Sequence, residues 1–246
     1  MDILTEDQLR ENWQKVWSNI EEAAQKSGRD PNEIKVVAVT KTHPTDLIKS
    51  AVRAGIKVIG ENYAQELRDK QHEFVDSSRE LPEWHFIGHL QRNKVKYIAP
   101  FVEMIHTVDS ERLAREIDKQ AAKNGRKLKV LLQVNTSGEE SKFGCEPTEI
   151  FNLAEAALKF ENLEVQGLMT IGSFADDEVT NRREFSLLRK LRDQCAEKFP
   201  DADWHHLSMG MTHDYPIAVD EGSTIVRVGQ ALFGPREEKC DTNFPN

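Results

Sequence analysis

One lysine in the sequence stands where a reactive amine could be positioned. Lys41 follows directly on the apolar, β-branched segment Val36–Thr40, which predicts a buried strand that ends next to it. A lysine at such an edge is ordinarily a solvated residue whose aliphatic stem packs on its neighbours. If the edge belongs to a binding site, partial loss of water favours the neutral amine, which can attack an aldehyde.

The C-terminal part of the sequence holds residues that could bind a phosphate. The segment HLSMGM, residues 206–211, places the Ser208 hydroxyl at the end of a predicted strand. The segment GSTIVRVGQALFG, residues 222–234, places Arg227 inside an apolar strand and Gly229 just beyond it. Glycine lets backbone N–H groups approach a phosphate closely. The ordinary interpretations are turns for the glycines and a buried ion pair for Arg227, because a lone buried charge is costly.

Taken together, these residues predict a site for pyridoxal 5′-phosphate (PLP). The Lys41 amine would form a Schiff base with the PLP aldehyde, and the phosphate would be held by Ser208, Gly229 and Gln230. Arg227 would donate a hydrogen bond to the ring nitrogen, because arginine does not readily give up its proton. A ring held in this way is a poorer electron sink than one paired with a carboxylate, which disfavours demanding carbanion chemistry.

Such a site requires strands whose ends meet at one edge of a parallel sheet. Short apolar segments alternate with helical patterns, which is typical of a parallel α/β fold. The predicted strands are 35–40, 57–60, 84–88, 103–108, 128–135, 163–171, 204–208 and 224–228. Eight βα units in about 250 residues match a (β/α)8 TIM barrel, with an open doubly wound sheet as the alternative.

The chain is expected to form one domain over residues 1–246. Its nine prolines fall between the periodic segments, and no low-complexity linker divides it. We expect an extra N-terminal helix over about 5–28, the barrel over about 35–234 and a short C-terminal tail.

The composition argues against several classes of protein. A net charge of -9 disfavours nucleic-acid binding, since an acidic surface repels phosphate backbones. No run approaches the roughly 18–20 apolar residues of a membrane helix, and the N-terminus has no signal pattern. Three widely spaced cysteines predict a cytoplasmic protein without a disulfide framework. The eight histidines lack the spacing of a metal site, so we expect no bound metal.

Seven segments, spread over nearly the whole chain, carry a resemblance to a known family. They are VVAVTKTHP (36–44), GENYAQE (60–66), WHFIGHLQRNK (84–94), VNTSGEESKFG (134–144), GLMTIG (167–172), HLSMGM (206–211) and GSTIVRVGQALFG (222–234). With these segments in this order, the sequence resembles the pyridoxal phosphate homeostasis proteins, the YggS/PROSC family. That family is related to the barrel domain of alanine racemase.

The resemblance implies a (β/α)8 barrel that holds PLP on Lys41. It assigns the phosphate and ring-nitrogen contacts to the residues given above, and it adds Asn62 beside the cofactor. Where the family often has a serine, this chain has Thr212, which keeps the hydroxyl.

The resemblance also implies a function in vitamin B6 homeostasis without established turnover. The expected partners are PLP and PLP-dependent apoenzymes, with no nucleic acid and no membrane, and we expect a monomer. One alternative is a small PLP-dependent amino-acid racemase or lyase, and another is a sugar-phosphate barrel enzyme. A two-base racemase needs a second acid–base group on the opposite face of the substrate. In alanine racemase, a domain after the barrel supplies that group. We expect no such domain here, because the sequence ends soon after the eighth strand.

Overall fold

The predicted apolar segments form the strands of a closed barrel. The computed structural model describes residues 4–77, 81–173 and 177–235, and the predicted C-terminal tail lies outside them from residue 236 on. Within these residues the strands are β1 (Lys35–Val39), β2 (Val58–Glu61), β3 (Glu83–Phe86), β4 (Met104–Val108), β5 (Leu128–Gln133), β6 (Leu163–Met169), β7 (His206–Ser208) and β8 (Ile225–Val228). Each strand pairs with the next, and β8 pairs in parallel with β1. The predicted (β/α)8 barrel is confirmed, and an open doubly wound sheet is excluded because the strands close on themselves.

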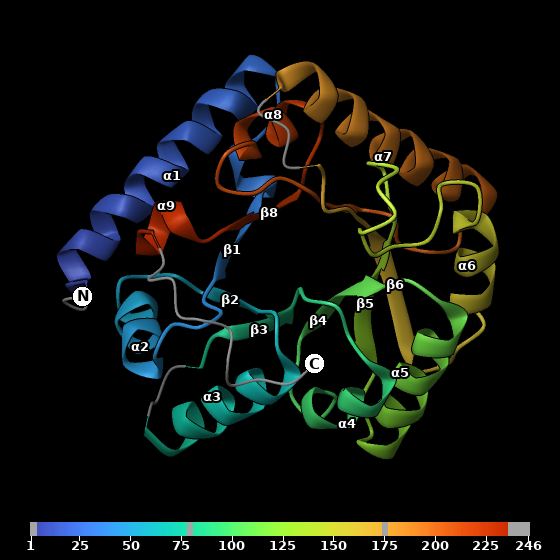
Figure 1. Cartoon of the computed structure of the whole chain (residues 1–246), viewed down its shortest axis with the longest axis horizontal. Coiled ribbons are helices and arrows are strands. Elements are labelled where there is room, and N and C mark those ends of the chain that lie inside the picture. Colours follow the sequence, from blue (N-terminus) through green and yellow to red (C-terminus); the bar gives the residue numbers. More distant parts are fainter. Residues whose placement is uncertain (1–3, 78–80, 174–176, 236–246) are drawn as a thin grey trace.

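Helices surround the strands on the outer side of the barrel (Figure 1). Within the described ranges they are α1 (Glu6–Lys26), η1 (Pro31–Glu33), α2 (Thr45–Arg53), α3 (Ala64–Ser77), η2 (Arg92–Lys94), α4 (Val95–Ile98), α5 (Glu111–Lys123), α6 (Ile150–Ala157), α7 (Glu178–Lys198), α8 (Tyr215–Asp220) and α9 (Gln230–Phe233). No periodic pattern in the sequence predicts η1 or α9, because each is only about one turn long. None of the described helices is long and apolar enough to cross a membrane.

The predicted N-terminal helix forms as α1 and completes the outer layer. Thr5 caps it, since its Oγ1 accepts the Gln8 N–H while Gln8 Oε1 accepts the Thr5 N–H. The helix packs beside α8 and α9, and the Asn12 side chain donates to the carbonyl of Leu232 at 2.9 Å. Within the described part of the chain β8 is followed by the short α9, and α1 covers this side of the barrel (Figure 1).

The alternation of side chains along the strands divides the core into two parts. Outward-pointing residues such as Val36 pack against the helices, and their neighbours point toward the barrel axis. The inner apolar residues are Val37, Val58, Ile87, Met104, Leu131, Met169 and Ile225. Buried polar side chains of His85, His106, Ser208 and Arg227 lie on the same strands. The barrel interior is therefore a packed mixture of apolar and hydrogen-bonded groups.

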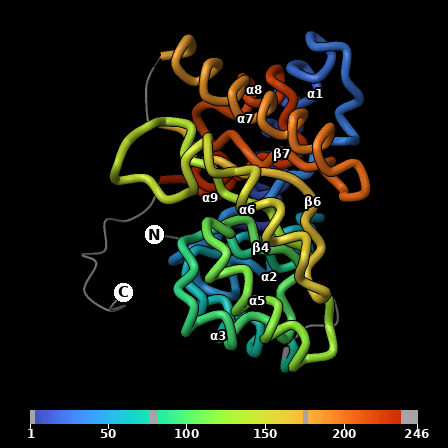
Figure 2. Tube along the Cα trace, turned by 90° about the vertical axis from the view of Figure 1, so that its right-hand side faces the viewer, coloured from blue at the N-terminus to red at the C-terminus, as the bar shows by residue number. Residues whose placement is uncertain are grey.

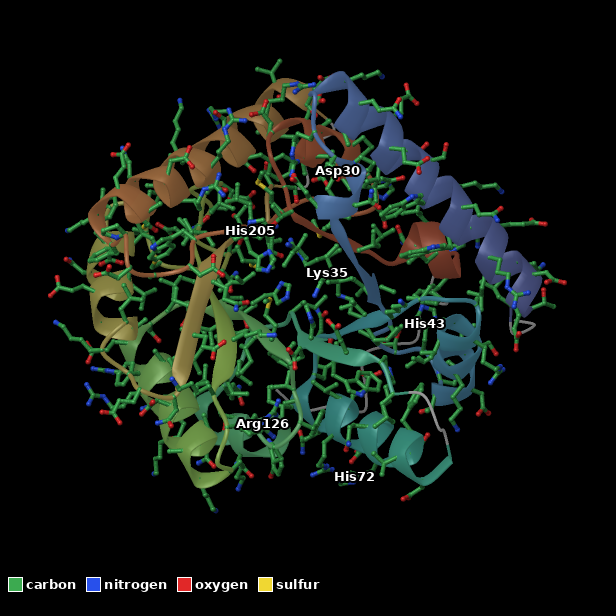
Figure 3. All side chains as sticks on the ribbon, turned by 180° about the vertical axis from the view of Figure 1, so that it is seen from behind. Asp30, Lys35, His43, His72, Arg126 and His205 are labelled. Carbon is green, nitrogen blue, oxygen red and sulfur yellow. The ribbon has the colours of Figure 1, made fainter. Side chains whose placement is uncertain are left out.

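The two ends of the barrel carry different groups. At the amino-terminal end Lys35 pairs with Glu83 at 3.0 Å, and Figure 3, seen from behind, shows Lys35 near the middle of the ring. At the carboxyl end lie α9 and the loop after β5, which project on the same side in Figure 2. Because functional residues of parallel barrels collect at the carboxyl ends of the strands, this end positions the candidate site.

Candidate functional site

Lys41 lies at the carboxyl end of β1, beside the end of β8. It is half-buried in the turn that leads from β1 to α2. Since Ala38 lies opposite Val228 in the sheet, the segments that follow the two strands leave the barrel next to each other. A Cβ built on Gly229 would lie 3.4 Å from both Cβ and the carbonyl oxygen of Val39, which shows how closely the two ends approach. The structure thus brings the predicted lysine and glycine together.

The side-chain hydroxyl of Thr212 lies at hydrogen-bonding distance from the backbone N–H of Gly229. The Thr212 Oγ1 accepts a hydrogen bond from this N–H at 3.3 Å. Gln230, which is exposed, follows as the first residue of α9. One hydroxyl and two successive backbone N–H groups therefore lie together at the end of β8. Such a set of donors suits a phosphate group.

Ser208 lies deeper in the barrel than this set of donors. It is opposite Ile225, a position that precedes Gly229 by about 13 Å of extended strand. Its Oγ accepts a hydrogen bond from Nη1 of Arg227 at 2.7 Å and lies 2.9 Å from Nδ1 of His106. The structure therefore brings Ser208 together with Arg227, but places Thr212 rather than Ser208 at Gly229.

Arg227 is a cation held in the barrel interior. It is 4% exposed, and its Nη2 donates to the carbonyl oxygen of Thr170 at 2.8 Å. Together with the bond to Ser208, two of the five guanidinium N–H donors are used. Burial lowers the pKa of Arg227 to about 10, and the charge of Asp214 opposes this shift. Within the described part of the chain no carboxylate forms an ion pair with Arg227, which leaves donors for a further acceptor.

Two buried histidines, His85 and His106, extend this network. The Nε2 of His106 lies 2.9 Å from Nδ1 of His85. Burial is the largest cause that lowers the pKa of both rings, so both are neutral near pH 7. Strand alternation in the sequence could have indicated that His106 points into the barrel, because it is two residues from the inward-pointing Met104.

Asn62 follows β2 and lies against the loop after β3. Its Oδ1 is buried and finds no hydrogen-bond partner among the described residues. Gly88 permits the close approach of the two loops, because a Cβ there would lie 2.1 Å from the Asn62 carbonyl oxygen. A buried acceptor without a partner costs roughly 1–3 kcal/mol. The amide oxygen of Asn62 is therefore suited to a ligand contact.

A buried group of three charged residues lies next to the turn that contains Lys41. Lys70 Nζ is 2.7 Å from Oε1 of Glu61 and 2.7 Å from Oε1 of Glu66. The sequence shows only that Glu66 and Lys70 have i,i+4 spacing, which is ordinarily an exposed helical ion pair. Their burial depends on how α3 packs against the end of the barrel, and spacing alone does not reveal it.

A hydrogen bond and a ring stacking contact hold the two ends of the loop after β5 at the barrel end. The Asn135 amide Nδ2 donates to the carbonyl oxygen of Glu139 at 3.0 Å, and the Phe143 ring stacks on His89 with centroids 3.8 Å apart. A cavity of about 570 Å³ on this side is lined by His89 and Asp109, and Lys41 is not among its lining residues. His89 therefore belongs to the wall of the barrel end.

The geometry defines a class of protein. It is a (β/α)8 barrel with a lysine, a hydroxyl and strand-end N–H groups side by side at its carboxyl end. Among the residues that the structure describes, no group of three His, Cys, Asp or Glu side chains could hold a metal ion. Such a barrel can hold an anionic ligand beside an amine.

Comparisons with known proteins give the family. The model of the family described as alanine racemase, N-terminal domain, matches residues 9–237. The pyridoxal phosphate homeostasis protein of Vibrio cholerae is 42% identical over 230 residues, which span 93% of this chain and 97% of that protein. The chain therefore belongs to the alanine racemase N-terminal domain family, among the pyridoxal phosphate homeostasis proteins.

Solved structures agree with this assignment. PipY of Synechococcus elongatus with PLP bound has a TM-score of 0.76 and 32% identity, covering 88% of this chain and 100% of PipY. An alanine racemase of Clostridium difficile has a TM-score of 0.73 at 17% identity, covering 96% of this chain and 62% of the racemase. The similarity to the alanine racemase shows a shared fold alone.

Proposed function

We propose that the chain binds PLP at the carboxyl end of its barrel, holds it covalently on Lys41 and takes part in vitamin B6 homeostasis. The observation that carries this proposal is that Lys41 follows β1 where Thr212 and Gly229 meet at the end of β8. The function named for the relatives and the PLP bound in PipY support it. PLP-dependent apoenzymes are the proposed recipients of the cofactor.

The side chains at this end suit the separate parts of PLP. The Thr212 hydroxyl and the N–H groups of Gly229 and Gln230 would bind the phosphate. Arg227 keeps N–H donors that could reach the ring nitrogen, and Asn62 keeps an acceptor without a partner among the described residues. A ligand of this chemistry would thus supply hydrogen-bond partners for the buried polar atoms of the site.

The covalent step needs only the Lys41 amine and the aldehyde of the cofactor. The amine adds to the aldehyde carbon, a C=N bond forms and one molecule of water leaves, so no oxidant or reductant is required. Ser208 is too deep in the barrel to meet Gly229, and we assign it a positioning role. It holds the Arg227 guanidinium through the 2.7 Å hydrogen bond.

We further propose that the chain holds PLP without a reaction of its own. A racemase needs acid–base groups on both faces of its substrate. The Tyr215 hydroxyl is buried and accepts a hydrogen bond from Asn19 at 2.8 Å, and the Tyr97 ring lies under the guanidinium of Arg68. Tyr63, which follows Asn62 and directly precedes α3, would carry the alternative, a small PLP-dependent racemase or lyase.

An absorption spectrum tests the proposal directly. Wild-type protein mixed with PLP should show the visible band of a Schiff base, and Lys41→Ala should not. Lys15→Ala, which changes an exposed lysine on α1, is the control and should behave as wild type. Incubation with amino acids should yield no steady product. Product formation that Lys41→Ala abolishes would favour the enzyme, and a wild-type protein that stays colourless with PLP would overturn the proposal.

A further inference from the structure

The charged group beside Lys41 is almost completely buried. We call Glu61, Glu66 and Lys70 the Lys70 cluster. The side chains of Lys70, Glu61 and Glu66 are 7%, 0% and 11% exposed. Taking three ionisable groups out of water is unfavourable, and a buried ion pair seldom adds much stability compared with apolar packing. This placement therefore calls for a reason other than stability.

The Lys70 cluster holds the backbone on both sides of Lys41. Before the lysine, Lys70 Nζ donates to the carbonyl oxygen of Thr40 at 2.8 Å, and the Thr40 hydroxyl donates to Glu61 Oε1 at 2.6 Å. After the lysine, the backbone N–H of Thr42 donates to Glu66 Oε1 at 2.7 Å. Three hydrogen bonds between the Lys70 cluster and the residues on either side thus flank Lys41.

The turn held in this way has an unfavourable backbone conformation. Thr42 has a φ of 68°, and within the described ranges it is the only residue other than glycine with a positive φ. This left-handed region is disfavoured for L-residues, most of all for β-branched ones. Such conformations persist only where their surroundings fix them, and they concentrate at functional sites. The bond from Thr42 N–H to Glu66 supplies part of that fixation.

Two carboxyl oxygen atoms of the Lys70 cluster accept no hydrogen bond from the described residues. Oε2 of Glu61 and Oε2 of Glu66 are both buried, and neither has a hydrogen-bond partner among the described residues. Two carboxyl groups share one ammonium group, so the cluster has a surplus of negative charge when both are ionised. Burial raises the pKa of Glu61 to about 7, and Lys70 opposes this shift.

We propose that Glu61, Glu66 and Lys70 are positioning residues that fix the direction in which Lys41 leaves β1. The cluster locks Thr40 and the left-handed Thr42, so the amine is presented to the incoming aldehyde in one pose. This inference rests on the proposed function, because the pose matters only if Lys41 captures the cofactor.

Glu66 is the member that tests this inference most cleanly. Removing Lys70 would leave two buried carboxylates facing each other, and loss of folding would then obscure the result. Glu66→Ala removes only the acceptor of the Thr42 N–H and one partner of Lys70. Glu66→Gln keeps an acceptor oxygen, and Glu11→Ala changes an exposed glutamate on α1 as a control.

A second substitution, at Thr42, distinguishes a role of Glu66 in positioning Lys41 from a role in the stability of the whole fold. Asparagine adopts the left-handed region more readily than threonine, so Thr42→Asn should lower the strain that Glu66 offsets. We expect Glu66→Ala to weaken PLP binding about tenfold, or about 1.4 kcal/mol. Glu66→Ala combined with Thr42→Asn should recover most of that loss, while Glu66→Gln and Glu11→Ala should stay close to wild type.

Hydrogen exchange of the Thr42 amide provides a readout that does not need PLP. In the protein without added PLP, Glu66→Ala should speed exchange at Thr42 and leave the amides of the barrel strands protected. Unchanged PLP affinity and unchanged exchange in Glu66→Ala would overturn the inference, as would a double variant that recovers nothing. If wild type takes up no PLP, the proposed function fails, and exchange at Thr42 still decides whether Glu66 holds this turn.

Discussion

The guanidinium Nη1 of Arg227 lies 2.7 Å from the hydroxyl of Ser208, at one end of a hydrogen-bonded chain that continues through His106 to His85. Because a guanidinium only donates, Ser208 Oγ accepts from it and its own proton can turn toward Nδ1 of His106. His106 then carries its proton on Nε2 and donates to Nδ1 of His85. The inferred series of hydrogen bonds starts at Arg227, which we assign to the ring nitrogen, runs in one direction to His85 and keeps both rings neutral.

The first prediction concerns Ser208→Ala. This change removes the acceptor of Arg227 Nη1 and the partner of His106 in a fully buried place, so it should lower the free energy of unfolding by about 1–3 kcal/mol. Urea denaturation at pH 7.5 measures the effect. Ser18→Ala, at an exposed position on α1, should leave the midpoint unchanged. Equal stabilities of the two variants would show that the hydrogen-bonded chain does not hold Arg227.

The second prediction separates the phosphate from the rest of the cofactor. Thr212→Val keeps the side-chain volume but removes the hydroxyl that meets Gly229 N–H. Because a hydrogen bond to a charged group contributes roughly 1.5–3 kcal/mol, PLP affinity should fall about 10- to 100-fold. Titrations followed by absorbance measure this loss.

Two controls accompany the Thr212 variant. Thr212→Ser should bind PLP nearly as well as wild type, because it restores the hydroxyl. Pyridoxal, which lacks the phosphate, should bind Thr212→Val and wild type alike. An equal loss for pyridoxal would show that Thr212 shapes the site without contacting the phosphate.

The apolar pattern of the strands predicts that Lys41, Gly229 and Gln230 follow strand ends, and the structure has Lys41 after β1 and the other two after β8. It does not locate the hydroxyl that meets Gly229. Ser208 ends a predicted strand and was therefore the expected residue, but Thr212 lies in a turn whose path depends on local hydrogen bonds, such as the one from the Tyr215 N–H to the Met211 carbonyl. A turn of this kind leaves no periodic signal.

Burial of polar residues was the other feature that spacing could not predict. Glu66 and Lys70 have the spacing of a surface ion pair, and Glu61 is the last residue of β2. Their inward placement follows from the packing of α3 against the barrel, which brings Lys70 to the carbonyl of Thr40. The eight-strand barrel itself was predictable, since it depends on alternation that is repeated along most of the chain.

The third prediction concerns stability in mild acid. Burial lowers the pKa of His206 from 6.5 to about 4, and the neighbouring His205 adds to the shift. Between these pH values the unfolded chain binds more protons than the folded chain, so the free energy of unfolding should fall as the pH decreases from 6.5 to about 4. Urea denaturation across this range should show a smaller dependence for His206→Gln. His72→Gln, at an exposed position in Figure 3, should keep the wild-type slope, and equal slopes for all three proteins would contradict the assignment.

The fourth prediction concerns Glu61, whose pKa shift makes the free energy of unfolding depend on pH in the opposite direction. Burial raises the pKa of Glu61 from 4.5 to about 7, so between these values the folded chain holds a proton that the unfolded chain has released. This contribution lowers stability as the pH rises from 4.5 to 7. Glu61→Gln removes the titrating group, and its stability should therefore depend less on pH near neutrality. A Glu61→Gln protein with the wild-type pH profile would place the proton elsewhere in the Lys70 cluster.

The most direct test of the central claim is peptide mapping of the adduct. Protein incubated with PLP is reduced with borohydride, digested and sequenced by mass spectrometry. We expect one pyridoxyl group per chain, on the peptide that contains Lys41, and none on that peptide in Lys41→Ala. An adduct found mainly on another lysine, or no adduct at all, would contradict this expectation.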